Sequence, residues 1–148
     1  MSRFQTILVP VDFSTHSDKA LDCALMLAKT FGARVHLLHA YHLPIQVATP
    51  DQVIIPRDFW TAVRDSAARK LEKALQKVTS TGVEGETHLA ELPPAQAITQ
   101  TAEKIGADLV VMGTRGLTGL KHVLLGSVAE RTIRSVSCPV MTVKDDSD

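Results

Sequence analysis

Short apolar stretches alternate along this chain with longer segments in which apolar residues recur every three or four positions. Residues 6–11 are apolar without alternation, which is typical of a strand buried on both faces. Further short stretches predict strands at residues 34–40, 83–90, 108–112 and 138–143. The stretch at residues 83–90 alternates polar and apolar positions, which favours a more exposed edge of the sheet.

The longer segments have the periodicity of amphipathic helices. Ser14 is a natural N-cap for the first of them. The second covers about residues 57–80, and we expect Trp60 and the apolar stripe of this helix to belong to the core. Two further helices are predicted, one that begins at the prolines at positions 93 and 94 and one over residues 127–136.

This alternation of strands and helices predicts an α/β fold: a Rossmann-like, open five-stranded parallel sheet with helices on both faces. If the fourth strand lies beside the first, the strand order is 3-2-1-4-5. The 148 residues contain no internal repeat or linker, so we predict a single domain over residues 1–148. Residues 41–56 contain three prolines without a clear period, and we expect a long mobile loop there.

Composition narrows the classes of function. The 16 basic and 16 acidic residues balance, so no net field favours nucleic acid or an anionic membrane. No apolar run approaches the roughly 20 residues that span a bilayer, and no signal-peptide pattern precedes the first strand. Cys23 and Cys138 lack metal or redox spacing and are expected to be buried free thiols. We therefore expect a cytoplasmic protein without nucleic-acid binding or membrane insertion.

Candidate chemistry is concentrated in one loop. The fourth predicted strand runs into Gly113 and Gly116, and nine residues later Gly126 and Ser127 open the last predicted helix. Glycines let the backbone approach an anion closely and present its N–H groups. A helix N-terminus adds unpaired N–H donors and about half a positive charge. The spacing Gly-x2-Gly-x9-Gly-Ser therefore predicts a phosphate cradle.

A second polar signal, Asp12, follows the first predicted strand. In the order 3-2-1-4-5, the carboxyl ends of the first and fourth strands flank one crevice, where ligands of such sheets bind. Asp12 could there accept hydrogen bonds from a ribose or base, and the alternative is a turn residue. The sequence contains no Gly-x4-Gly-Lys-Ser/Thr, which excludes a P-loop NTPase. No Gly-x-Gly-x-x-Gly follows the first strand, which argues against a dinucleotide-binding fold.

Three stretches resemble the ATP-binding members of the universal stress protein family, and the resemblance covers essentially the whole chain. They are Ile-Leu-Val-Pro-Val-Asp at 7–12, Met-Gly-Thr-Arg-Gly at 112–116 with Leu-Gly-Ser-Val-Ala at 125–129, and Cys-Pro-Val at 138–140. The resemblance implies an adenine-nucleotide site for ATP, ADP or AMP, with Mg2+ held through the phosphates as a further expectation.

The same resemblance implies the residues of this site and their roles. Pro10, Val11 and Asp12 would flank adenine and ribose, Ala40 would offer its backbone to the adenine edge, and Met112 and Gly113 would lie under the ribose. Arg115 and Gly116 would border the phosphates, which Gly126, Ser127 and Val128 would bind.

The resemblance also implies a homodimer formed through the last strand. Pairing of Val140–Val143 with a second copy would hide an edge that is otherwise unpaired.

Three functions remain open at this point. The first is a stress-response sensor or adaptor whose affinity for an unknown protein partner depends on the bound nucleotide. The second is a slow ATPase or phosphotransferase that uses the same site, with Lys121 and His122 near the phosphates. The third is a dimeric scaffold without nucleotide, against which the intact glycines argue. No catalytic residues are assigned.

The histidines around the second predicted strand do not suggest a metal site. His36, His39 and His42 lie three residues apart, whereas ligands on one face of a strand would lie two apart. His36 and His39 are therefore expected on opposite faces, in packing and surface roles.

Overall fold

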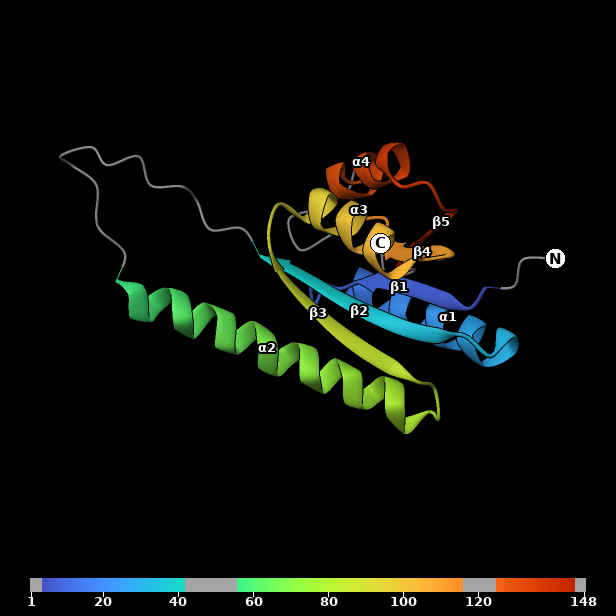
Figure 1. Ribbon diagram of the computed structural model, residues 1–148, viewed down its shortest axis with the longest axis horizontal. Coiled ribbons are helices and arrows are strands. Elements are labelled where there is room, and N and C mark those ends of the chain that lie inside the picture. Colours follow the sequence, from blue (N-terminus) through green and yellow to red (C-terminus); the bar gives the residue numbers. More distant parts are fainter. Residues whose placement is uncertain (1–3, 42–55, 116–124, 146–148) are drawn as a thin grey trace.

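The computed structural model describes residues 4–41, 56–115 and 125–145 of the chain (Figure 1). Strands and helices alternate along the described part of the sequence, as the apolar pattern predicts. Their bounds are β1 Thr6–Pro10, α1 Thr15–Phe31, β2 Arg34–Tyr41, α2 Arg57–Ser80, β3 Gly85–Glu91, α3 Pro94–Ile105, β4 Leu109–Gly113, α4 Ser127–Ser135 and β5 Val140–Val143. The loop expected at residues 41–56 lies almost entirely outside the described residues.

The five described strands form one parallel sheet in the order β3-β2-β1-β4-β5, which confirms the predicted topology. The register aligns Leu8 of β1 with His36 of β2 and Val110 of β4. The central strands carry apolar side chains on both faces, so Ile7, Leu8 and Val9 are completely buried. Burial on both faces explains why this stretch of sequence does not alternate.

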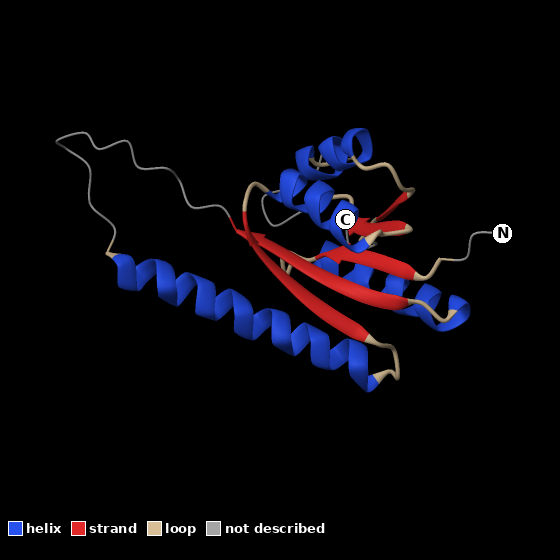
Figure 2. Cartoon of the chain, viewed as in Figure 1, coloured by secondary structure: helices blue, strands red, loops and turns tan. Residues whose placement is uncertain are grey.

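Helices cover both faces of the sheet, and each face has its own hydrophobic core (Figure 2). α1 and α2 pack on one face, around Ile7, Val9 and Leu37. α3 and α4 pack on the other face, around Leu8 and Leu38. Because successive strand residues point to opposite faces, neighbouring positions of one strand serve different cores.

Three strands begin later than predicted, β4 by one residue and β3 and β5 by two. β3 begins at Gly85, where a Cβ atom would lie 2.7 Å from Leu75 and 2.9 Å from Val78 of α2. This glycine therefore allows α2 to pack directly on the start of the strand. β5 begins at Val140 because Pro139 has no N–H for the ladder, although its carbonyl accepts from the Val110 N–H at 3.0 Å.

Two burial expectations are wrong. Ala67, Leu71 and Val78 of α2 are buried, but Trp60 near the start of the helix is only half-buried and stands edge-on against Phe59. The first turns of α2 extend past the sheet (Figure 1), so an apolar stripe continues where no strand lies beneath it. Cys23 and Cys138 are free thiols but are half-buried rather than buried. Within the described residues, no helix is long and apolar enough to cross a membrane.

Replacement of Ile98 tests the core on the α3 face. Ile98 is 1% exposed, so Ile98→Ala should lower the free energy of unfolding by about 2–5 kcal/mol through lost burial and a residual cavity. The matched control is Ile133→Ala in α4, where the side chain is 46% exposed and the expected loss is about 0.5 kcal/mol. Urea denaturation measures both, and equal losses would contradict the assignment of this core.

Candidate nucleotide-binding site

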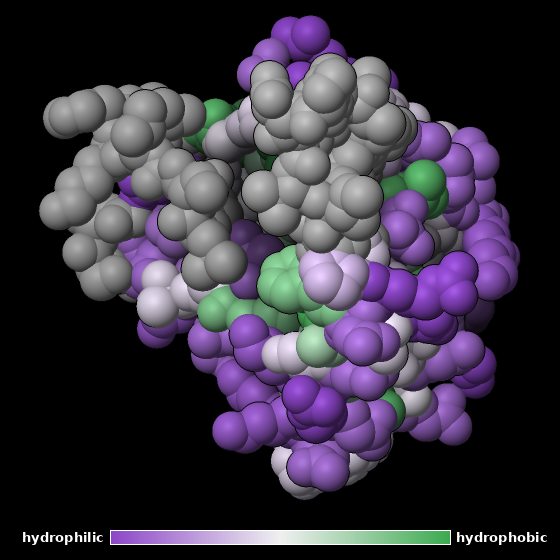
Figure 3. All heavy atoms as spheres, turned by 90° about the vertical axis from the view of Figure 1, so that its left-hand side faces the viewer, coloured by the Kyte–Doolittle hydropathy of each residue, from purple (hydrophilic) through white to green (hydrophobic). Residues whose placement is uncertain are grey.

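The direction of winding reverses between β1 and β4. The chain leaves β1 through α1 on one face of the sheet, whereas it reaches β4 from α3 on the other face. The connections of these two neighbouring strands therefore lie on opposite faces of the sheet and leave a crevice at the carboxyl ends of the strands. Ligands of open parallel sheets bind in such a crevice. In the described part of the face that shows this end of the sheet, hydrophobic surface lies among hydrophilic surroundings (Figure 3).

The turn after β1 is organised by Asp12. Its Oδ1 accepts a hydrogen bond from the Ser14 N–H at 3.0 Å and a second one from the Ser14 hydroxyl. Ser14 is the N-cap of α1, and its Oγ in turn accepts from the Ser17 N–H at 3.2 Å. The turn role considered for Asp12 is thus present, and the expected cap role of Ser14 is confirmed. Between them, Phe13 has a φ of 65°, a left-handed conformation that is costly for an aromatic residue.

His39 of β2 contacts this turn, a partner that the sequence pattern does not predict. Its Nδ1 donates a hydrogen bond to the Val11 carbonyl at 2.8 Å, and its ring lies against Phe13 with centroids 4.6 Å apart. Lys70 of α2 places its Nζ 5.6 Å from the centre of the same Phe13 ring. These contacts hold Phe13 in its unusual conformation. His36 and His39 do point to opposite faces, as predicted, since His39 alternates with Leu38 and shares the face of Leu37, whereas His36 shares the face of Leu38.

The end of β4 is packed tightly against the first turn of α1. A Cβ atom at Gly113 would lie 2.8 Å from His16 Cβ and 2.9 Å from the His16 carbonyl carbon. Most of that contact is backbone, which cannot move aside without shifting the helix. The absence of a side chain at Gly113 is therefore required by the fold itself, whatever else the residue binds.

The loop after β4 is closed at its base by backbone hydrogen bonds. The Thr114 N–H donates to the Val143 carbonyl at 3.1 Å, and the Gly126 N–H donates to the Thr114 carbonyl at 2.6 Å. Thr114 is buried, and its hydrogen bonds hold both ends of the loop at the carboxyl ends of β4 and β5. This closure places the start of α4 directly beside the end of β4.

α4 begins without a side-chain cap. Gly126 is its N-cap, with ordinary extended backbone angles, and Ser127 opens the helix as an exposed residue. The first four N–H groups of a helix have no intrahelical partner, and here no N-cap side chain accepts from them. α1 differs, because its Ser14 does so. The start of α4 can therefore present amide donors to an anion.

The predicted site residues within the described part gather at this edge of the sheet. Pro10 ends β1, and Val11 and Asp12 follow it. Ala40 lies near the end of β2, and Met112 and Gly113 end β4. Gly126 precedes α4, which begins with Ser127 and Val128. Arg115 follows β4 as a half-buried residue. Gly116, Lys121 and His122 lie outside the described residues, so their predicted roles have no structural description.

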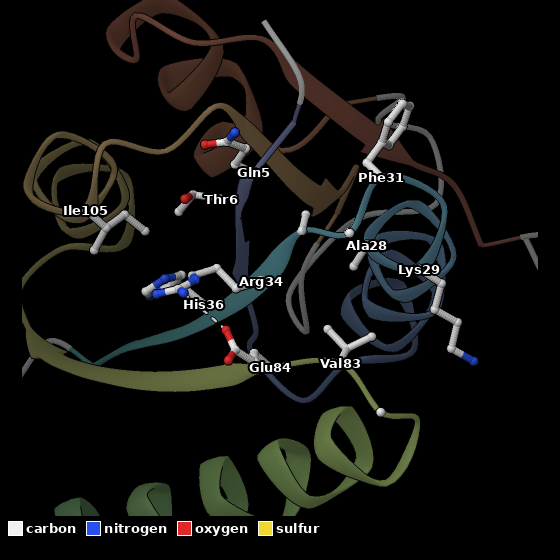
Figure 4. A pocket seen from close by; sticks show the side chains of 13 residues that line it. Gln5, Thr6, Ala28, Lys29, Phe31, Arg34, His36, Val83, Glu84 and Ile105 are labelled. Atoms are coloured by element: carbon white, nitrogen blue, oxygen red, sulfur yellow. Dashed lines mark ion pairs between the residues drawn. The ribbon is translucent and has the colours of Figure 1, made fainter.

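A hollow of about 890 Å³ lies at the opposite end of the sheet (Figure 4). It is lined by residues at the starts of β1 and β2, such as Thr6 and Arg34, and by Gly82 and Val83 just after α2. The strands begin here, so this hollow is separate from the edge at which their carboxyl ends meet.

Alanine substitution of two glycines tests the packing of the β4 end. Gly113→Ala should lower the free energy of unfolding by about 1–3 kcal/mol, because the new Cβ atom collides with the α1 backbone. Gly126→Ala, whose Cβ would lie 3.2 Å from the Thr114 carbonyl oxygen, should cost about 1 kcal/mol or less. Chemical denaturation without nucleotide distinguishes them, and a Gly113 variant as stable as the native chain would refute this contact.

The comparisons with known proteins agree on one family. Residues 3–144 match the model of the universal stress protein family. A universal stress protein of Methanocaldococcus jannaschii is 37% identical over 145 residues, or 95% of this chain and 82% of that protein.

Two solved structures resemble this chain over most of their length. A universal stress protein in complex with cAMP is 25% identical, with a TM-score of 0.73 over 97% of this chain and 98% of the other. The universal stress protein of Archaeoglobus fulgidus in complex with dAMP is 26% identical, with a TM-score of 0.66 over 97% of this chain and all of the other. Because the family model matches nearly the whole length of this chain, the chain belongs to the universal stress protein family.

Proposed function

We propose that this chain is a cytoplasmic regulatory protein that binds an adenine nucleotide (ATP, ADP or AMP) across the carboxyl ends of β1 and β4. The observation that carries the proposal is the start of α4, which has glycine instead of a side-chain cap and is held beside the end of β4 by the Gly126–Thr114 hydrogen bond. The relatives solved with cAMP and dAMP support the adenine base. Free thiols at Cys23 and Cys138 suit a reducing compartment.

The nucleoside would lie at the ends of β1, β2 and β4. Pro10, Val11 and Met112 supply apolar surface there, and Ala40 offers backbone groups to the edge of the base. Asp12 would accept from ribose while Ser14 occupies its Oδ1, since an ionised carboxylate has about four acceptor positions. In this proposal, these residues recognise the base by its shape and the ribose by its hydroxyl groups.

The phosphates would lie at the start of α4. The amides of Ser127 and Val128 and the Ser127 hydroxyl would donate to them, and the helix dipole would favour their negative charge. Gly126, Arg115 and Gly116 complete the proposed phosphate contacts, with Arg115 able to offer two parallel N–H donors. Mg2+ would be held through the phosphates and water rather than by a dedicated protein cage.

A regulatory role fits this site better than catalysis. Hydrolysis needs a base or a residue that positions water, and Asp12, the carboxylate that follows β1, is engaged in the turn that caps α1. No observation on the described residues favours the ATPase alternative. We propose instead that nucleotide occupancy changes the affinity for a protein partner, which requires that the two states differ in that affinity. Equal partner affinity with and without nucleotide would contradict this role.

We also propose that β5 pairs with β5 of a second copy. β5, at Val140–Val143, is an edge strand of the sheet and pairs with β4 along one side. Met141 is 37% exposed although the strand is apolar, and an unpaired apolar edge promotes association. A two-fold arrangement would cover both edges at once.

Two substitutions at Ser127 separate the backbone amide from the hydroxyl. Proline is tolerated at the first helical position, and Gly126, with ψ of 164°, has the backbone that a residue before proline requires. Ser127→Pro therefore removes the amide and hydroxyl donors while it keeps α4. Ser127→Ala removes the hydroxyl alone and is the matched control.

ATP, ADP or AMP at 100 times its dissociation constant should stabilise the native chain by roughly 2.7 kcal/mol, which is a shift of several degrees in Tm. We expect a smaller shift for Ser127→Ala at the same nucleotide concentration and a still smaller one for Ser127→Pro, which loses two phosphate donors instead of one. Thermal unfolding of nucleotide-free protein measures all three. An unchanged shift in the proline variant would show that the phosphates do not bind at the start of α4. The absence of any shift in the native chain would refute nucleotide binding.

The β5 interface is tested by a charge at its exposed side chain. Met141→Lys should convert the dimer to a monomer, because a lysine on the edge strand opposes pairing with another chain. The matched control is Phe59→Lys in α2, where the native side chain is 51% exposed near the opposite edge of the sheet. Size-exclusion chromatography with light scattering gives the mass, and a monomeric native chain would exclude this interface.

A further inference from the structure

Three potential metal ligands meet across β2 and β3. His36 and Glu86 are direct partners in the register of the two strands, and His88 lies two residues further along β3 on the same face. The His36 Nδ1 lies 2.9 Å from the His88 Nε2 and 3.7 Å from the nearest Glu86 carboxylate oxygen. The three ligand atoms all lie within 4.8 Å of one another.

The spacing of these atoms suits a tetrahedral cation. Ligands about 2.0–2.1 Å from zinc stand roughly 3.3 Å apart when the geometry is tetrahedral. The distances of 2.9 and 3.7 Å from His36 Nδ1 lie on either side of that value. The two imidazole rings are inclined by 22° with their centroids 5.1 Å apart, and their nitrogens face each other across the 2.9 Å contact. Binding of one ion would require rotation of the side chains, so that the lone pairs of the two imidazoles and the carboxylate of Glu86 turn toward a common point.

Both rings are poised to act as ligands. Burial is the main cause that lowers the pKa of His36 and of His88. The pKa of His36 is lowered further by His88 and Arg34 and that of His88 by Lys104, whereas Glu86 raises both. Neutral imidazoles carry the lone pair that a metal needs. Without metal, one ring donates its proton to the other at 2.9 Å. With metal, the donor ring would take its other tautomer, so no proton need be gained or lost.

The site is supported from inside and open from outside. The His36 side chain is 7% exposed, which fixes its ring, whereas the Glu86 side chain is 65% exposed. The His36 ring also lines the hollow at the starts of β1 and β2, near Ile105 and beside the Arg34–Glu84 ion pair (Figure 4). Arg34 is paired with Glu84 at 3.1 Å, so part of its charge is neutralised. A cation can therefore arrive from solvent at a partly organised site.

We propose that His36, Glu86 and His88 form a binding site for a divalent transition-metal ion, with zinc as the best match. Two imidazoles and one carboxylate suit zinc, whereas magnesium and calcium favour oxygen ligands. Three protein ligands leave the fourth tetrahedral position for water or for a ligand that enters from the hollow. The site does not depend on the proposed nucleotide function, since it lies on side chains of β2 and β3 that the nucleotide proposal does not use.

Metal binding is tested with tag-free protein and two ligand variants. Calorimetric titration with Zn2+ should show one ion per native chain. Removal of a group that merely supports a ligand costs about 10- to 100-fold in affinity, so Glu86→Gln and His88→Gln should each lose about 100-fold or more. Glu91→Gln is the matched control, because it makes the same change on the same strand at a position that faces the other side.

Substitution of Co2+ for zinc identifies the ligand atoms, and folding controls show whether the variants keep their structure. Co2+ in place of zinc should give the visible spectrum of a four-coordinate nitrogen and oxygen site, without the thiolate charge-transfer band that Cys23 or Cys138 would produce. Circular dichroism of the metal-free variants checks their fold, and Glu86→Gln changes an exposed side chain if His88→Gln does not fold. The proposal is overturned if the native chain binds no zinc, if Glu86→Gln binds like Glu91→Gln, or if cobalt shows thiolate ligation.

Discussion

The contact between Gly113 and the first turn of α1 determines the geometry of the carboxyl edge. α1 covers one face of the sheet and begins directly after the Asp12 turn, while Gly113 ends the strand on which the second half of the fold is built. Because the glycine meets helix backbone, the two halves cannot separate or slide without losing this fit. The Asp12 turn and the start of α4 are therefore held at a fixed spacing. A site assembled from both halves depends on that spacing more than on any single side chain.

The sequence was sufficient for the topology because its signals are local or periodic. Uninterrupted apolar residues in β1, the cap at Ser14 and the proline at the start of α3 each act within a few residues. The strand order follows from placing the fourth strand beside the first, and the structure confirms that order. The features that the sequence does not predict depend on contacts between residues that are distant in the sequence. Trp60 fits a core stripe, but only the length of the sheet beneath α2 decides its burial.

The histidines illustrate the same limit. Spacing along β2 correctly separates His36 from His39, yet it cannot show what the neighbouring strand places opposite each of them. His88 and Glu86 come within reach of His36 only through the register of β2 and β3, fifty residues apart in sequence. The alternation of polar and apolar positions at residues 83–90 is the available signal, but by itself it indicates only an exposed edge of the sheet. At the candidate nucleotide site, Asp12 was readable as a turn residue, but its partner His39 was not.

The hydrogen bond between Gly126 and Thr114 also has an evolutionary consequence. It joins the two ends of the intervening loop at a buried point, so β4 and α4 are positioned by that join and not by the chain between them. Lengthening a closed loop costs little, about 0.6 kcal/mol of closure entropy for each doubling of its length. Insertions and deletions between these two residues should accordingly be tolerated without displacing the helix. The hydrogen bond at its base, and not the length of the segment that it closes, sets the position of α4 beside β4.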